Sequence, residues 1–92
     1  MAFGGRMLLN VTVPEDLDYV GMMDDILARY TTFSHMKRVK STNMGSMFRL
    51  TYEVVLVDRS ESKRMIDEIR CRNGNLEVSL ADAEMREESS GL

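Results

Sequence analysis

Apolar and polar side chains alternate in two segments of the chain, and a period of two is typical of β-strands. The first segment runs from Arg6 to Val13 and ends at Pro14. The second runs from Phe48 to Leu56, with charged and hydroxyl side chains at the intervening positions. We therefore predict two strands that direct the following residues toward a helical layer: Met7, Leu9, Val11 and Val13 from the first, and Phe48, Leu50, Tyr52, Val54 and Leu56 from the second.

A helix is predicted between these strands, because apolar residues recur there at steps of three and four. Pro14 followed by Glu15 and Asp16 favours a helix start, since acidic side chains are stabilised near the positive end of the helix dipole. The β-branched and hydroxyl residues from Thr31 to Ser34 should end this helix, and His35 to Thr42 should form a polar strand. The helical residues expected to face the core are Leu17, Val20, Met23, Leu27 and Tyr30.

A second helix is predicted after Ser60, a residue type that caps helix N-termini. It should end at Asn73-Gly74, because the cations Arg70 and Arg72 suit a last helical turn and glycine readily adopts the left-handed cap. The residues expected in the core are Met65, Ile66 and Ile69, and a short final strand should contain Leu76, Val78 and Leu80.

The predicted order is strand, helix, strand, strand, helix, strand. This βαββαβ order indicates an α+β fold of the ferredoxin-like type, with four antiparallel strands in the order 4-1-3-2 and two helices on one face. We expect one domain over residues 6–84, with flexible termini at 1–5 and 85–92. In this topology, the loop after the first strand, the hairpin, and the loop after the second helix meet at one end of the sheet.

The net charge of −3 argues against general nucleic-acid binding, yet the two signs are separated along the chain. The block from Glu15 to Asp25 contains acids and no base, whereas Ile26 to Tyr52 contains bases and no acid. Two surfaces of opposite sign are expected, either as solvated faces or as binding surfaces. The single cysteine and the lack of a long apolar run favour a cytoplasmic setting for this chain, with no membrane span.

Asn43-Met44-Gly45 fits a tight hairpin loop in which Gly45 takes a positive φ. Met44 then points outward. An exposed thioether is an adaptable contact group, so Met44 is either a docking residue or packs over a neighbouring loop.

We predict an anion-receptive patch where the hairpin meets the loop after the second helix. It would contain Lys40 and Ser46, the guanidinium groups of Arg70 and Arg72, and the backbone N–H groups from Asn73 through Gly74 to Asn75. The alternative is structural, since cations suit the end of a helix and Asn-Gly-Asn suits a helix cap. Glu15 and Asp16 could also pair with the arginines.

No catalytic, metal or cofactor site is predicted. His35 stands alone among basic neighbours, and Cys71 has no partner base, so neither a metal site nor a nucleophile is indicated. RNA recognition by a ferredoxin-like sheet needs aromatic side chains on the open face, where this chain is expected to place Asn10, Thr12 and Thr51. We therefore expect a protein that is not an enzyme and does not bind nucleic acid.

The segments Val39 to Val54 and Ile66 to Val78 resemble the C-terminal soluble domain of a family of uncharacterised prokaryotic membrane proteins with several spans. The resemblance covers nearly the whole chain and rests on Lys-Ser-Thr-Asn-Met-Gly-Ser from Lys40 and on Arg-Cys-Arg-Asn-Gly-Asn from Arg70. It implies a cytosolic domain tethered to the membrane in a longer parent protein, with polyphosphate metabolism as an implied process. It supplies no catalytic residue.

These observations favour a regulatory or protein-interaction domain. The alternative is an ACT-like sensor that binds phosphate, polyphosphate or a carboxylate between two protomers. In either case a homodimer is expected through the open sheet face or an edge strand, because Leu8, Val55 and Val57 should lie on the side that no helix covers.

Overall fold

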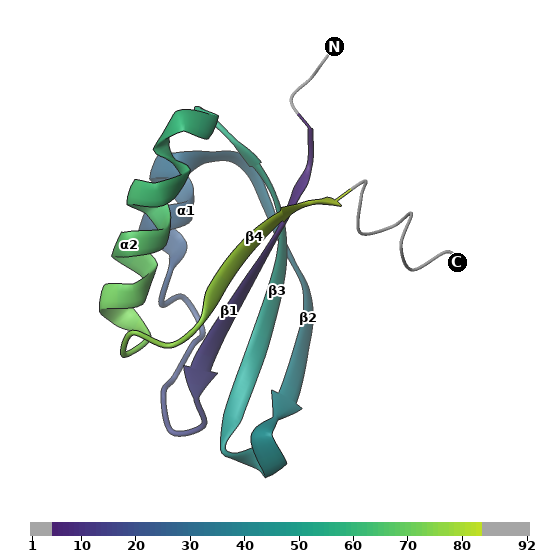
Figure 1. Ribbon diagram of the computed structural model, residues 1–92, viewed down its shortest axis with the longest axis vertical. Helices are drawn as coiled ribbons and strands as arrows, with labels where there is room; N and C mark the ends of the chain where they lie inside the picture. Colours follow the sequence, from purple (N-terminus) through teal and green to yellow (C-terminus); the bar gives the residue numbers. More distant parts are fainter. Residues whose placement is uncertain (1–4, 84–92) are drawn as a thin grey trace.

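The computed structural model describes residues 5–83. The strands are β1 (Met7–Pro14), β2 (Thr31–Thr42), β3 (Met47–Leu56) and β4 (Val78–Asp82), and the helices are α1 (Asp24–Tyr30) and α2 (Ser62–Arg72) (Figure 1). Two short 3-10 turns, η1 (Asn43–Gly45) and η2 (Arg59–Glu61), precede β3 and α2. The predicted flexible termini lie outside the described residues, except for Gly5.

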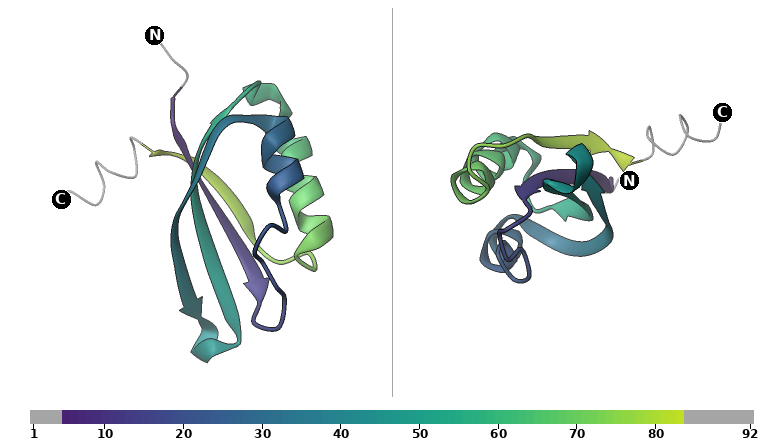
Figure 2. Two further views of the ribbon diagram at one scale, coloured as in Figure 1. Left: turned by 180° about the vertical axis from the view of Figure 1, so that it is seen from behind. Right: turned by 90° about the horizontal axis from the view of Figure 1, so that it is seen from below.

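The four strands form one antiparallel sheet in the order β2-β3-β1-β4, which is the predicted order read from the opposite edge. Both helices cover the same face of the sheet, and the other face carries no helix among the described residues (Figures 1 and 2). The predicted ferredoxin-like α+β fold is therefore confirmed.

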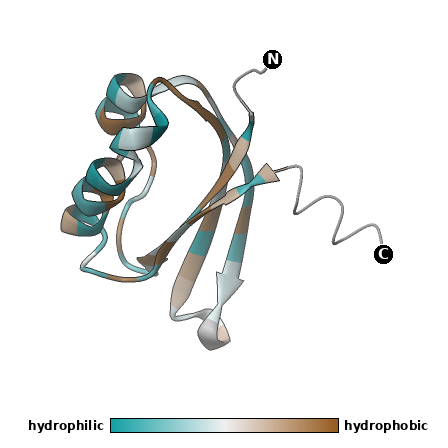
Figure 3. Cartoon of the chain, turned by 45° about the horizontal axis from the view of Figure 1, so that its top comes forward, coloured by the Kyte–Doolittle hydropathy of each residue, from teal (hydrophilic) through white to brown (hydrophobic). Residues whose placement is uncertain are grey.

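The core lies between the sheet and the two helices. Leu50, Tyr52 and Val54 of β3 are buried there. Hydrophilic and hydrophobic positions alternate along the strands of the sheet (Figure 3). The predicted alternation of β1 and β3 is thus confirmed, because a strand with one buried face must place every second side chain in the core. The other fully buried apolar residues are Leu9, Val11, Val13, Met23, Ile26, Met65 and Ile69.

The first helix is shorter than predicted. Residues 15–23 form turns, in which Leu17 N–H donates to the Pro14 carbonyl and Asp24 N–H to the Gly21 carbonyl. Gly21 has a φ of +73°, which a right-handed helix does not allow, so α1 begins only at Asp24. Val20 is 78% exposed, and its predicted place in the core was wrong.

Other boundaries also differ from the predictions. β4 begins at Val78, so Leu76, which was predicted to lie in this strand, precedes it. Asp58, rather than Ser60, caps the turn before α2, because its side chain accepts hydrogen bonds from both the backbone N–H and the hydroxyl of Ser60. Residues Thr31 to Ser34 belong to β2, which is consistent with the strand preference of β-branched and aromatic residues. Ile66 is half-buried.

Candidate interaction surface on the open face of the sheet

The open face is the side of the sheet opposite the helices. On β1 and β3 it carries the residues that alternate with the core, including Asn10 and Thr51. The Thr51 hydroxyl donates to Asn10 Oδ1 at 2.6 Å. Because this bond uses the amide oxygen, the Asn10 NH₂ group can donate to a further acceptor.

The strand register adds cations to this open face. Arg38 of β2 lies opposite Thr51, and Lys40 lies opposite Arg49. Residues directly opposite each other share a face, and so do residues two apart on one strand. Arg38, Lys40 and Arg49, all exposed, therefore form one cluster, which we call the basic face. Lys37 lies at the register shift between Met36 and Arg38. Like charges directly opposite each other are unfavourable, so the pairing of Lys40 with Arg49 lowers the stability of the hairpin.

The cations of this hairpin differ from most others in the described residues by lacking an acidic partner. Cations paired with a carboxylate are Arg6, Arg29, Lys63, Arg64 and Arg72. Within residues 5–83, no ion pair involves Lys37, Arg38, Lys40 or Arg49. Arg59 and Arg70 share this property, but they lie in η2 and in the last turn of α2, not on the hairpin. The unpaired charge is therefore concentrated on β2 and β3.

The hairpin tip is more strained than the sequence indicates. Gly45 has the predicted positive φ, of +91°, and Met44 also has one, of +57°. A left-handed conformation is costly for a residue with a long side chain. Met44 is fully exposed, as predicted. Asn43 belongs to η1 at this tip, and the Ser46 carbonyl accepts a hydrogen bond from Glu15 N–H. This bond ties the hairpin to the loop that follows β1.

The Asn73-Gly74-Asn75 segment is a helix cap. Asn75 N–H donates to the Arg70 carbonyl, and Gly74 has a φ of +76°, as in a Schellman motif. The Asn73 side chain is buried and donates from Nδ2 to the Thr12 carbonyl at 2.7 Å. Its amide therefore holds the end of α2 against β1 and is not presented to a ligand.

The predicted anion patch is not assembled by the described residues. Arg72 forms two hydrogen bonds with the Asp25 carboxylate of α1, at 2.6 and 2.8 Å, and a third with the Met22 carbonyl. Arg70 lies two residues earlier in the same helix, about 200° around its axis, and so points away from α1. Lys40 lies on the open face, across the sheet from both arginines. The sequence could not reveal this separation, because it depends on strand register and on which side of α2 faces α1.

The α1–α2 contact is a network of charged hydrogen bonds. Arg29 Nη1 donates to both carboxylate oxygens of Glu68, and the Tyr30 hydroxyl donates to Glu68 Oε2 at 2.6 Å. The hydrogen bonds from Tyr30 and Arg29 lower the pKa of Glu68. The hydrogen bonds from Arg72 lower the pKa of Asp25 to about 2. Both carboxylates are therefore ionised at neutral pH.

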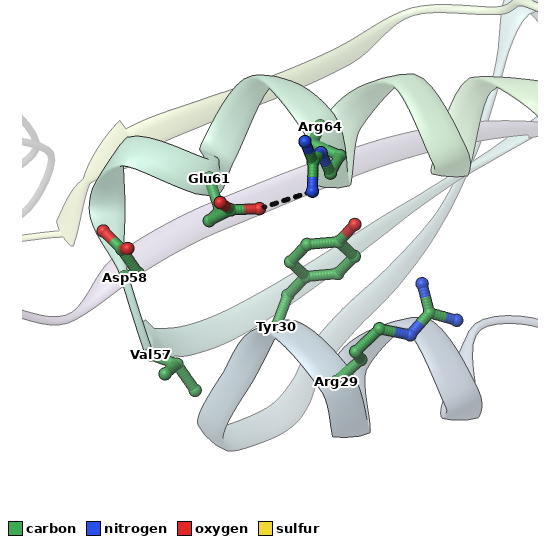
Figure 4. A pocket seen from close by; sticks show the side chains of 6 residues that line it. All are labelled: Arg29, Tyr30, Val57, Asp58, Glu61 and Arg64. Atoms are coloured by element: carbon green, nitrogen blue, oxygen red, sulfur yellow. Dashed lines mark ion pairs between the residues drawn. The ribbon is translucent and has the colours of Figure 1, made fainter.

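A cavity of about 310 Å³ lies beside this network, between the end of α1 and the start of α2 (Figure 4). Its charged side chains already have partners: Arg64 pairs with Glu61 at 3.5 Å, Arg29 with Glu68, and Asp58 with Ser60. The remaining lining residues are Tyr30 and Val57. A charged ligand would have to break one of these pairs, so the basic face is the better candidate site.

The open face also has an apolar end, formed by Leu8, Phe33 and Val55. Phe33 lies opposite Val55 in the strand register, and the Arg6 guanidinium lies 5.2 Å from the centre of the Phe33 ring. Leu8 is buried, Val55 is half-buried, and Phe33 is 40% exposed. Val57, also predicted on this face, instead lines the cavity. The face therefore combines an apolar end with a basic end.

Neither a protein-family model nor a curated protein matches the sequence. Among solved structures, the chain is similar to protein MK0293 from Methanopyrus kandleri AV19, with a TM-score of 0.58 and 14% sequence identity. The similarity covers 85% of this chain and 47% of that protein, so the chain spans about half its length. At this identity the likeness shows the fold alone. No helix in the described part of the chain is long and apolar enough to cross a membrane.

Proposed function

We propose that this chain is a non-enzymatic regulatory or protein-interaction domain that docks an acidic partner on its basic face. The observation that supports this proposal is the cluster of Arg38, Lys40 and Arg49, which lacks carboxylate partners among the described residues. Fold stability favours opposite charges across strands, whereas here two cations face each other. An acidic partner would neutralise this repulsion.

Met44 supplies a second contact in this proposal. It is a fully exposed apolar residue, held in the left-handed region at the end of the same hairpin. Strained backbone positions are often associated with function, and an exposed thioether adapts to different partner surfaces. The partner would therefore contact the basic face through charge and the tip through Met44.

A small-anion sensor of ACT type is the second candidate function. It is favoured by the same cluster, because the guanidinium groups of Arg38 and Arg49 and the amide NH₂ group of Asn10 could hold a multi-oxygen anion. Phosphate, polyphosphate and carboxylate ligands all fit this chemistry. In this case binding would not require an extended protein surface.

Backbone amide NMR distinguishes the two functions. We expect a blocked peptide rich in glutamate to shift the signals of Arg38, Lys40 and Arg49, and phosphate or a dicarboxylate to shift them much less at equal charge. Saturable shifts from a small anion, together with none from the peptide, would favour the sensor. If no anion shifts these residues, both proposals are wrong. The charge reversal Arg38→Glu should weaken binding of the acidic peptide. Arg59→Glu in η2 makes the same charge change away from the basic face and is the matched control, so it should leave the binding unchanged.

A further inference from the structure

β2 is an edge strand whose outer side has no strand partner among the described residues. Its register with β3 is regular from Arg38, opposite Thr51, to Thr42, opposite Met47. In an antiparallel pair, alternate residues direct both backbone groups toward the partner strand, and the others direct them away. This five-residue stretch of β2 therefore presents N–H and C=O groups that a further strand could pair with.

The side chains of this stretch specify what such a strand should carry. Arg38 and Lys40 lie on the open face, whereas Val39 lies opposite Leu50 and shares the helix-side face. Val39 is 38% exposed, because no described strand covers it. A complementary strand would place acidic side chains beside the two cations and an apolar side chain beside Val39.

The same features disfavour pairing of β2 with a second copy of itself. Two β2 edges would bring Lys37, Arg38 and Lys40 of one copy close to the same cations of the other. Charged side chains on exposed edges commonly prevent such self-pairing. An acidic strand meets no such barrier.

We propose that an extended acidic segment of a partner protein adds to the outer edge of β2 as a further strand, along Arg38 to Thr42. Its acidic and apolar side chains alternate, so that acids meet Arg38 and Lys40 and an apolar residue covers Val39. This inference rests on the proposed function and adds a defined geometry to it, since backbone hydrogen bonds supply affinity and alternating side chains supply specificity.

A blocked peptide of about eight residues with alternating glutamate and valine is the probe. We expect it to slow hydrogen exchange of the outward-facing amides between Arg38 and Thr42 by about tenfold or more, because they become hydrogen-bonded. A peptide of the same composition, with all glutamates followed by all valines, is the control for charge alone. It should bind more weakly and leave exchange at these amides unchanged.

N-methylation of alternate backbone nitrogens in the probe tests the strand geometry directly. Methylation of the nitrogens whose N–H groups face β2 should weaken binding by about tenfold or more, because these groups would donate to β2. Methylation of the alternate nitrogens, which face away, should change binding little. Equal effects of methylation at the two sets of nitrogens would contradict the proposal of an added strand.

Two outcomes separate this inference from the proposed function. If both the alternating and the block peptide bind the basic face with no protection of β2 amides, acidic docking stands and the added strand is wrong. If neither peptide binds, the proposed function fails as well.

Charge reversal in the protein tests the contribution of the two cations. The double variant Arg38→Glu with Lys40→Glu should weaken binding of the alternating peptide by about tenfold or more. The control pair Arg59→Glu with Arg70→Glu carries the same charge change and should alter binding by less than about twofold.

Discussion

At the scale of single residues, Asn73 shows how a turn motif also serves as a tertiary contact. Its buried side chain donates to the Thr12 carbonyl of β1 and, at 3.4 Å, to the Leu76 carbonyl. Its Oδ1 accepts no hydrogen bond within the described part of the chain. Asn73→Asp would replace the donor with a carboxylate that faces carbonyl oxygens. We expect the free energy of unfolding at pH 7 to fall by about 3 kcal/mol.

The pH dependence of this variant provides a check. Burial without donors raises the pKa of the introduced carboxyl above its unfolded value of about 4. A carboxyl whose pKa is raised by folding destabilises the fold when it is ionised, and this effect is lost as the pH falls below the unfolded pKa. The loss in the free energy of unfolding, relative to the parent protein, should therefore shrink in acid. Denaturant unfolding at several pH values measures it. Asn75→Asp is the control, because Asn75 is exposed and aspartate tolerates its φ of +64°. An equal loss in the control would contradict the prediction.

The pairing of Lys40 with Arg49 leads to a second prediction at this scale. Arg49→Glu places opposite charges across β2 and β3, so the free energy of unfolding should rise by about 0.5 kcal/mol. The same change should weaken binding of the acidic peptide. Arg70→Glu carries the same charge change but creates no cross-strand pair and places an acid at the negative end of α2, so as a control it should not raise the free energy of unfolding and should leave peptide binding unchanged. A destabilised Arg49→Glu variant would show that Arg49 stabilises the fold in a way that its exposure does not indicate.

At the scale of elements, α1 and α2 are joined by ion pairs that titrate in acid. Asp25 and Glu68 have folded pKa values below their ordinary values, so their contribution to stability is present above the unfolded pKa and is lost as pH falls through the folded pKa. For Asp25 this window runs from the ordinary value of 3.8 down to about 2.

Arg72→Gln should return the Asp25 pKa toward 3.8, because the largest cause of its depression is the hydrogen bond from Arg72. The variant should be less stable than the parent protein above about pH 4, and the difference should shrink as the pH falls through about 2, leaving only the loss of the hydrogen bond from Arg72 to the Met22 carbonyl. Carboxyl NMR titration and unfolding at several pH values measure both effects. Lys63→Gln, which removes an exposed pair with Asp67 on α2 alone, is the control. If the Asp25 pKa stays near 2 in Arg72→Gln, the assigned cause is wrong.

The elements also show what the sequence could predict. The alternation of apolar and polar residues in β3 predicts which side chains face the core. The predicted burial of Leu50, Tyr52 and Val54 is confirmed. The start of α1 was missed because it depends on the backbone of Gly21 and on the hydrogen bond between Glu15 and Ser46, which joins distant segments. The basic face was missed because it depends on strand register. The basic block was visible in the sequence, but the pairing of Lys40 with Arg49 was not.

At the scale of the whole molecule, charge is separated across the sheet. The exposed acids Glu15, Asp16 and Asp18 lie in the connection from β1 to α1, on the helix side (Figure 1). The basic face lies on the opposite side of the sheet. The acidic block therefore lies in the connection between β1 and α1, and the basic cluster lies on the open face of β2 and β3. A negative net charge is compatible with an anion-binding surface, since that charge is concentrated elsewhere.

This separation determines how the predicted homodimer should respond to salt. Two copies meeting through their open faces could bury Phe33 and Val55, but they would also bring their basic faces closer together. Raising salt from about 0.1 to about 1 M shortens the Debye length from about 10 to about 3 Å and screens this repulsion. We expect self-association at high micromolar concentration to strengthen with salt, whereas binding of the acidic peptide to β2 should weaken.

Sedimentation at the two salt concentrations tests this expectation. Val55→Ser should reduce the dimer fraction, because it removes apolar area from the open face, whereas Val20→Ser, on the exposed connection before α1, should not. A protein that stays monomeric at both concentrations would show that the apolar end is no interface. A dimer that weakens with salt would indicate a different contact, in which the basic face of one copy meets the acidic connection of another. Since that contact is not self-complementary, it would extend to larger assemblies unless it closed into a ring.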